Sequence, residues 1–260
     1  MRRWLGLLFL TLLAAPSRAG EPTTPLRLAA ASDLQTAMPE LIKAFREGKG
    51  LEVSATFGAS GQLAEQIKAG APFDVFLSAN RKFVEDLAAT GDVAPESVRP
   101  YARGSLVLVV HEEAGAGIER LSDLTKPGVK KVALANPAFA PYGAAAKQAL
   151  VKEGIWEALG PKRVQAETVR QALQFVQSGN AEAGLVGRSI AKVKGVRVLE
   201  IDPDLYDPIV QGLGIVARSA HPGEARAFAD FLLGERGQEI LAAGGFGRIA
   251  TKAARSDARR

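Results

Sequence analysis

Residues 26–45, LRLAAASDLQTAMPELIKAF, hold the pattern that decides the fold. The run Leu26–Ala31 is short and apolar, which is typical of a buried strand. Four apolar residues between Met38 and Phe45 then recur at the i, i+3, i+4, i+7 spacing of an amphipathic helix. A polar turn that begins at Ser32-Asp33 separates the two. A strand that runs through such a turn into a helix is the repeating unit of α/β proteins.

The same alternation continues along the chain. Helical spacing returns at residues 169–176 and 228–232. The runs typical of strands are Leu26–Ala31, Leu51–Phe57, Asp74–Ser78, Leu106–Val110, Lys131–Ala135, Arg163–Ala166, Ala183–Val186, Val196–Leu199 and Leu213–Ala217. We therefore expect an α/β protein with mostly parallel sheets. Breaks rich in Gly, Pro or Asp near His111–Gly117 and Asp202–Pro208 favour two lobes joined by crossing segments.

The first residues have the layout of a secretory signal peptide. Arg2 and Arg3 precede an apolar run, Trp4–Ala15, and small residues then allow a cut after Ala19. The run is shorter than the ~20 residues that span a bilayer, although an N-terminal membrane anchor remains an alternative. The chain has no cysteine, which excludes a lipidated cysteine, disulfides and thiolate metal sites. We expect an exported protein whose signal peptide, residues 1–19, is removed.

The positive charge lies at the two ends of the chain. The formal net charge is +5, of which the leader supplies three arginines and the tail at residues 251–260 a net +3. The folded body is therefore close to −1. This balance removes the main support for nucleic-acid binding, which depends on a basic surface.

Five turns between a strand and a helix carry small or hydroxyl residues: Ala30–Asp33, Gly58–Gly61, Asn136–Gly143, Ala166–Val169 and Val186–Ser189. In open α/β sheets ligands bind beyond the carboxyl ends of the strands. A helix N-terminus adds unpaired N–H groups and the positive end of a dipole. Turns of this kind, gathered at one cleft, suit a small anion without any lysine.

The serines in these turns also fit a purely structural role. Ser32 with Gln35 matches a capping box, and Ser60 is a plausible N-cap before a helix. The capping and ligand-binding roles are compatible, because a cap hydroxyl lies beside the free amides that an anion would use. The glycines on either side of Ser60, Gly58 and Gly61, allow the backbone to approach a ligand closely.

Other chemistry is poorly supported. The two histidines, His111 and His221, have no metal-ligand spacing, and surface roles are expected for both. The sequence has neither a Gly-x-Ser-x-Gly elbow nor a phosphate loop ending in Gly-Lys-Ser/Thr. The carboxylates of Asp33, Asp74 and Glu167 lie near strand ends, where such groups usually cap helices or stay solvated. We expect no enzyme, no catalytic residue and no cofactor.

Read in order, these turns resemble the molybdate-binding proteins of bacterial ABC importers, a molybdate/tungstate solute-binding family. The resemblance covers about Leu26 to Phe246. Its segments are Leu28–Ser32, Phe57–Ser60, Gln66–Ala79, Asn136–Lys147, Glu167–Leu173, Gly184–Val186, Phe228–Leu232 and Gly244–Phe246.

The resemblance implies a type II periplasmic binding fold with two crossings between lobes. Lobe 1 would comprise residues 24–110 and 209–251, lobe 2 residues 111–208, and residues 252–260 a basic tail. Ser32 and Ser60 would donate hydroxyl and backbone N–H bonds to a dehydrated oxyanion, and Tyr142 and Val169 would donate backbone N–H bonds. These contacts reach oxygens, so none of the four is a direct metal ligand. The implied partners are molybdate or tungstate and an inner-membrane ABC permease, and a monomer without nucleic acid is expected.

One position departs from the family pattern. Well-known members carry a tyrosine directly after the Gly-Leu/Ile-Val strand, and its hydroxyl contacts the ligand. Here that position is Gly187, followed by Arg188. We expect the Gly187 N–H group or a bridging water to take its place, with Arg188 entering the cleft as the alternative.

Three other functions remain open. The protein could bind another anion, such as sulfate or an organic acid. Amino-acid binding would need an arginine with an acidic partner, and Arg170 and Arg188 lack an evident one. The chain could be an exported α/β hydrolase, although no histidine follows the strands beside Ser32 and Ser60. The effector lobe of a transcription regulator shares the fold, but the signal peptide argues against it.

Overall fold

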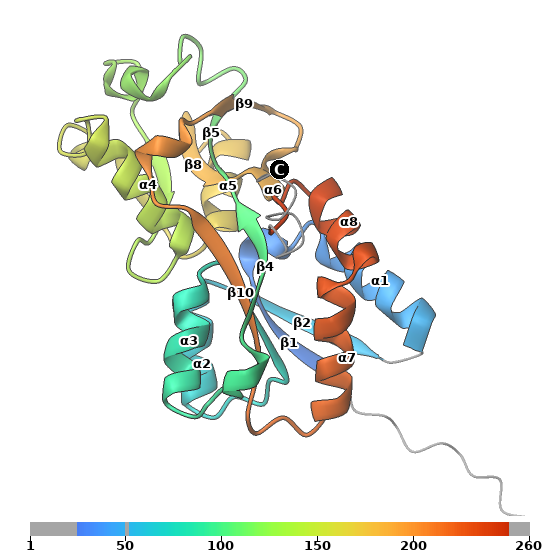
Figure 1. The fold of residues 1–260 in the computed structure, drawn as a ribbon. Coiled ribbons are helices and arrows are strands. Elements are labelled where there is room, and N and C mark those ends of the chain that lie inside the picture. Colours follow the sequence, from blue (N-terminus) through green and yellow to red (C-terminus); the bar gives the residue numbers. More distant parts are fainter. Residues whose placement is uncertain (1–24, 50–51, 250–260) are drawn as a thin grey trace, which may run out of the picture.

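The computed structural model describes residues 25–49 and 52–249, so the expected signal peptide and basic tail lie outside the described residues. The described chain forms two lobes, each built on a five-stranded sheet. Figure 1 shows the lobes one above the other, with two segments running between them at β4–β5 and at β10. The expected two-lobed α/β fold is confirmed.

The sheet of lobe 1 has the order β2-β1-β3-β10-β4. Its strands are β1 (Leu26–Ala31), β2 (Val53–Gly58), β3 (Val75–Ser78), β4 (Arg99–Gly104) and β10 (Ile209–Ile215). Strand β1 pairs in parallel with β2 and β3, whereas β10 pairs antiparallel with β3 and β4. Strand β1 lies inside the sheet and is buried except at Arg27, and this burial explains why the rest of the run is apolar.

The helices of lobe 1 cover both faces of this sheet. They are α1 (Met38–Lys49), α2 (Ser60–Lys68), α3 (Arg81–Ala89), α7 (Pro222–Leu233) and α8 (Glu235–Ala243), with the short 3₁₀ helices η1 (Ser32–Leu34) and η2 (Pro95–Ser97). One core joins β1 and β10 to α1, α7 and α8, where Phe45 and Phe228 pack edge to face at 5.2 Å. A smaller core lies under α2 and α3 on the opposite face.

The sheet of lobe 2 has the order β7-β6-β8-β5-β9. Its strands are β5 (Leu106–His111), β6 (Val132–Ala135), β7 (Arg163–Ala166), β8 (Ala183–Gly187) and β9 (Val196–Glu200). The other elements of this lobe are α4 (Pro141–Lys152), α5 (Val169–Gln177), α6 (Arg188–Ala191), η3 (Leu121–Thr125), η4 (Gly160–Lys162) and η5 (Pro203–Leu205). Strand β6 pairs in parallel with β7 and β8, and β5 pairs antiparallel with β8 and β9.

Two expectations about the sheets need correction. The sheets are mixed rather than mostly parallel, because in each lobe a strand that comes from the other lobe runs against its neighbours. Sheet membership also places the first crossing earlier than the expected boundary at 110/111. Strand β4 pairs in lobe 1 and β5 in lobe 2, so the chain crosses at Ser105.

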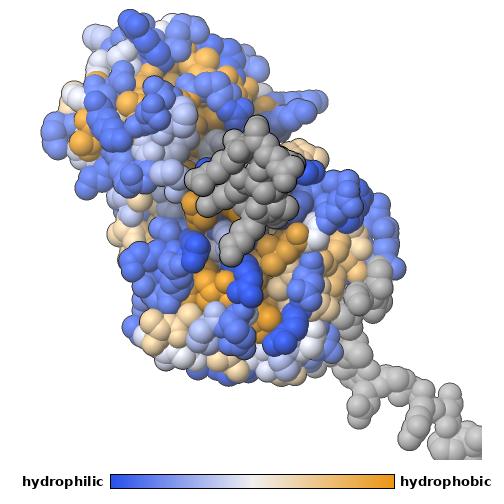
Figure 2. All heavy atoms as spheres, viewed as in Figure 1, coloured by the Kyte–Doolittle hydropathy of each residue, from blue (hydrophilic) through white to orange (hydrophobic). Residues whose placement is uncertain are grey.

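Hydrophilic residues cover much of the visible outer surface of both lobes in Figure 2. Within residues 25–49 and 52–249, no helix has the length and apolar character needed to cross a bilayer.

Candidate ligand-binding site

The parallel strands bring the predicted turns to two sheet edges. In lobe 1, β1 and β2 run side by side in the same direction and end at Ala31 and Gly58. In lobe 2, the parallel strands β6, β7 and β8 end at Ala135, Ala166 and Gly187. Each of the five predicted turns therefore lies at the carboxyl edge of its sheet, where α/β proteins bind ligands.

Direct contacts hold the two edges against each other. The Gly61 N–H group at the start of α2 donates to the carbonyl of Phe139, just before α4, at 2.9 Å. The Ser189 hydroxyl of α6 donates to the Asp33 carbonyl of η1, also at 2.9 Å. Helices α5 and α6 of lobe 2 both contact η1. The turns of the two lobes therefore face one another in a closed arrangement.

Gly61 is required by this close approach. A Cβ atom there would lie 3.1 Å from both the Cα atom and the carbonyl oxygen of Phe139. Backbone on the opposite lobe would have to shift by a few tenths of an ångström, which is harder for backbone than for a flexible side chain. The sequence indicated a glycine for close backbone approach to a ligand, and the structure shows it at an approach between lobes.

Ser32 and Ser60 are buried at the starts of their helices, with exposed fractions of 5% and 1%. Both capping predictions are wrong. The N-cap residues are Ala31 and Ala59, and neither helix has a side-chain cap hydrogen bond, because each serine already lies inside its first turn. The Ser60 Oγ atom accepts from the Ala79 N–H group at 2.9 Å, which leaves its proton to donate. Ser32 Oγ has no hydrogen-bond partner in the part of the chain that the structure describes.

Tyr142 and Val169 lie in the first turns of α4 and α5, where backbone N–H groups have no partner within the helix. The first turn of α5 is capped by Thr168, whose hydroxyl oxygen accepts from the Gln171 N–H group at 3.1 Å. The predicted donor groups thus come from helix starts in both lobes. Their role as ligand contacts stays a prediction.

The ring of Tyr142 occupies the space beside Gly187. A Cβ atom at Gly187 would lie 2.9 Å from the Tyr142 Cζ atom, and one at Gly104 only 2.2 Å from its hydroxyl oxygen. A tyrosine at position 187 therefore requires the Tyr142 ring to move. The Arg188 side chain forms an ion pair with the exposed Glu200 on β9, so its charge has a partner outside the predicted donor set. The sequence indicated a role only for the Tyr142 amide, whereas the structure shows that its side chain matters too.

A buried polar cluster joins the lobes behind Ser32. We call it the Asp33 cluster, and its members are Asp33, Tyr101, Tyr142, Ser189 and Gln211. Gln211 Nε2 donates to Asp33 Oδ2 at 2.5 Å and to the Tyr142 hydroxyl oxygen at 3.3 Å. The Tyr101 hydroxyl donates to Gln211 Oε1 at 2.5 Å. Among the described residues, Asp33 Oδ1 is the one side-chain nitrogen or oxygen that is wholly removed from solvent and has no hydrogen-bond partner.

Burial determines the protonation of this cluster. Removal of the Asp33 carboxyl from water raises its pKa to about 6, despite the hydrogen bond from Gln211 and the nearby Tyr142 hydroxyl, which lower it. Burial, together with the negative charge of Asp33, also holds the pKa values of the Tyr101 and Tyr142 hydroxyls well above their ordinary value. No ion pair to Asp33 is present among residues 25–49 and 52–249.

The other sequence candidates lie in structural roles. Asp74 accepts from the Arg27 N–H group at 2.7 Å and from the Ser219 hydroxyl at 2.6 Å, and both bonds hold lobe 1 together. Glu167 is exposed. His111 accepts backbone N–H bonds from the turn that follows it. No group of three His, Cys, Asp or Glu residues that could hold a metal ion occurs in the described parts of the chain.

The structure adds several residues that the sequence did not indicate. Gln211 and Tyr101 lie far from the five turns in the sequence and carry no motif, whereas Ser189 lies within the fifth turn but was not singled out. Gln211 is fully buried, and a buried glutamine in a strand is a signal that only the structure reveals.

The strand-to-helix turns of the two lobes face each other, and they carry neutral hydrogen-bond donors. This arrangement is typical of a protein that binds a small solute between its lobes. The comparison with family models agrees: the model of the bacterial extracellular solute-binding proteins matches residues 26–247. This chain belongs to that family.

Individual relatives agree over almost the whole length. The molybdate-binding protein ModA of Azotobacter vinelandii is 36% identical over 240 residues, which cover 91% of this chain and 93% of that protein. ModA of Rhodobacter capsulatus is also 36% identical, over 88% of this chain and 89% of its own. The solved Azotobacter vinelandii periplasmic molybdate-binding protein superposes with a TM-score of 0.81 at 30% identity, over 86% of this chain and all of that chain. The sulfate-binding protein SubI of Mycobacterium tuberculosis, at 21% identity and a TM-score of 0.75, shares the fold.

Proposed function

We propose that this chain is the solute-binding component of an ABC importer, which binds molybdate or tungstate between its lobes and delivers it to a membrane permease. The observation that supports the proposal is that helix starts of the two lobes face one another. We infer that Ser32 and Ser60 in one lobe and Tyr142 and Val169 in the other supply neutral donors there. The names of the relatives at 36% identity point to the same ligand.

Neutral donors suit a dianion that must be released again. Hydroxyl and amide dipoles already aimed at the ligand compensate its charge without a lysine or arginine. Closure removes water from the ligand and strengthens each of these bonds. Opening restores hydration, and release to the permease then requires no ion pair to be broken.

Selectivity among oxyanions would depend on the size and the protonation state of each oxyanion. Molybdate and tungstate are tetrahedral dianions at neutral pH, and sulfate has the same charge with shorter bonds. A rigid set of donors from two lobes therefore discriminates by the distance between its donors. The Gly187 N–H group or a water beside it is our proposed fifth donor, with the Tyr142 ring setting the space available there.

Removal of the leader after Ala19 would release the protein into the periplasm, where it acts as a monomer, and the permease would recognise the closed lobes. We propose no catalytic activity and no cofactor, because the relatives are solute-binding proteins and the donor set lacks a nucleophile with a base.

A thermal-shift series tests the ligand. Molybdate, tungstate, sulfate and phosphate are added at equal excess to the mature chain in a buffer free of other oxyanions. A ligand at 1,000 times its Kd adds about 4 kcal/mol to the free energy of unfolding, so the transition with molybdate and tungstate should rise by several degrees. No shift with either would refute the proposal, and a larger shift with sulfate would reassign the ligand.

A further inference from the structure

The carboxyl group of Asp33 is buried without a cation beside it, and one of its oxygens is unpaired among the described residues. It is 1% exposed and lies directly after Ser32, at the carboxyl end of β1. A buried carboxylate normally has a cation or several hydrogen-bond donors, because an uncompensated charge is costly away from water. Gln211 donates to Asp33 Oδ2, and the Tyr142 hydroxyl and the backbone N–H groups of Asp33 and Leu34 also favour the charged form, while Oδ1 has no hydrogen-bond partner among the described residues.

The groups around Asp33 come from both lobes and are all neutral. Gln211 on β10 and Tyr101 on β4 belong to lobe 1. Tyr142 on α4 and Ser189 on α6 belong to lobe 2, and Ser189 donates to the Asp33 backbone carbonyl. The nearest basic side chain along α6, Arg188, is paired with Glu200 on β9. The closed arrangement therefore surrounds this carboxyl group with dipoles and supplies no positive charge.

We propose that Asp33 is a positioning residue that joins the two lobes in the closed state and takes up one proton from solvent when the oxyanion binds. The inference rests on the proposed function. The proton adds to the carboxylate, most simply at Oδ1, and no bond between heavy atoms changes. Protonation turns an acceptor without a partner into a donor, so the Asp33 cluster becomes neutral beside the dianion.

Closure and ligand act in the same direction. Opening the lobes separates Asp33 from Tyr142 and Ser189 and admits water, which returns its pKa toward the ordinary value. Closing buries the group and raises the pKa to about 6. A dianion beside Ser32 then repels the carboxylate and raises the pKa further. Linkage requires the converse: affinity must fall as pH rises above the pKa of the open, ligand-free state, by up to tenfold per pH unit, until the pKa of the bound state is passed.

Titration calorimetry with molybdate tests the proton uptake. Binding is measured at pH 7 in two oxyanion-free buffers with different ionisation enthalpies, because the difference in observed heat gives the number of protons taken up. We expect close to one proton per ligand in the wild-type chain and none in Asp33→Asn. The dissociation constant should rise with pH between 6 and 8 in the wild type and stay constant in Asp33→Asn.

Matched variants separate positioning from general structure. Asp33→Asn resembles the protonated acid and should bind at least as tightly as the wild type at pH 8, whereas Asp33→Ala leaves Gln211 unpaired and should bind at least tenfold more weakly. Asp74→Asn changes another buried aspartate of lobe 1 and should keep the wild-type proton uptake. Molybdate binding without proton uptake, or equal affinities for Asp33→Asn and Asp33→Ala, overturns this inference alone. A wild-type chain that binds neither molybdate nor tungstate overturns the proposed function instead.

Discussion

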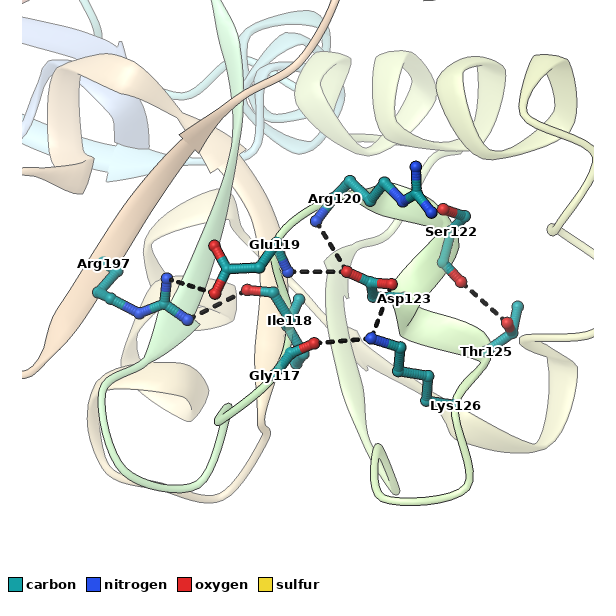
Figure 3. A network of polar contacts seen from close by, with 9 residues as sticks. All are labelled: Gly117, Ile118, Glu119, Arg120, Ser122, Asp123, Thr125, Lys126 and Arg197. Carbon is teal, nitrogen blue, oxygen red and sulfur yellow. Dashed lines mark hydrogen bonds and ion pairs between the residues drawn. The ribbon is translucent and has the colours of Figure 1, made fainter.

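Two buried aspartates in this protein have opposite surroundings. Asp123 in lobe 2, shown in Figure 3, accepts from the backbone N–H groups of Glu119 and Arg120 at 2.8 and 3.2 Å and pairs with Lys126 at 2.9 Å. The hydrogen bond and charge of Lys126, with the backbone donors, lower its pKa. Asp33, between the lobes, has one hydrogen-bonded oxygen and no cation, and burial raises its pKa to about 6.

The difference separates a carboxylate whose surroundings favour its charge from one whose burial opposes it. The surroundings of Asp123 satisfy the charged form, and Lys126 also donates to the Gly117 carbonyl, so the group fixes the loop between β5 and β6. The surroundings of Asp33 leave Oδ1 without a hydrogen-bond partner among the described residues. A buried polar group left in that state, at the meeting of two lobes, indicates a site completed by something that binds.

The largest effect should come from wedging the lobes apart at Gly61. A valine there would push against the Phe139 backbone and keep the Asp33 region open, without touching the Asp123 region. We expect Gly61→Val to weaken molybdate binding by at least ~100-fold, about 2.7 kcal/mol. Calorimetry measures this. Gly128→Val is the matched control, because a Cβ atom there meets nothing within 4 Å. Unchanged affinity in Gly61→Val would mean that binding does not need the closed lobes.

A smaller effect is expected from Ser60→Ala. The change removes a hydroxyl donor to the ligand and the acceptor of the Ala79 N–H group. Loss of one hydrogen bond to a charged group costs about 1.5–3 kcal/mol, so affinity should fall by about 10- to 100-fold. Ser122→Ala, beside Asp123, should leave affinity unchanged. If both variants bind like the wild type, the Ser60 hydroxyl is not a ligand contact.

The smallest effects are expected from substitution of the two aspartates. The two substitutions should change the free energy of unfolding in opposite directions. The Asp33 pKa is raised on folding, so its contribution to stability is present below pH 3.8 and is lost as pH rises through about 6. At pH 8, Asp33→Asn should therefore stabilise the ligand-free chain, by about 1–2 kcal/mol after allowance for altered hydrogen bonds. The Asp123 pKa is lowered, so its contribution is present above pH 3.8 and is lost on acidification. Asp123→Asn should destabilise the chain at pH 8. Urea unfolding at pH 5 and pH 8 measures the free energy of unfolding of both variants. If both substitutions change this free energy in the same direction at pH 8, the comparison is contradicted.

The local pattern of the sequence predicted most of the fold. Strands β1 and β7 were predicted to the residue, and for β1 the reason is that a largely apolar run before turn residues is a local signal. Strand β4 was missed, since Arg99 and Pro100 are poor strand residues that only an edge strand tolerates. The sequence predicted strand β10 at Leu213–Ala217, whereas it spans Ile209–Ile215, because Gly212 and Gly214 are unusual in the interior of a strand. Both glycines are required by the close approach of α3, at Arg81 and Val84.

The site was predicted in part, for a physical reason. Helix starts such as those at Ser60 and Val169 are local features, so the turns could be located from the sequence. The Asp33 cluster depends on residues that meet only after the chain has crossed between the lobes twice. Gln211 contacts Asp33 across 178 positions of sequence, and no local pattern predicts such a pair.

The most direct measurement is an anomalous difference map from crystals grown with molybdate and recorded at the molybdenum absorption edge. The account predicts one peak per chain between the lobes, with the oxyanion oxygens within hydrogen-bond distance of Ser32, Ser60 and the amides of Tyr142 and Val169. A peak elsewhere on the molecule, or crystals that hold no molybdenum at saturating ligand, would contradict it.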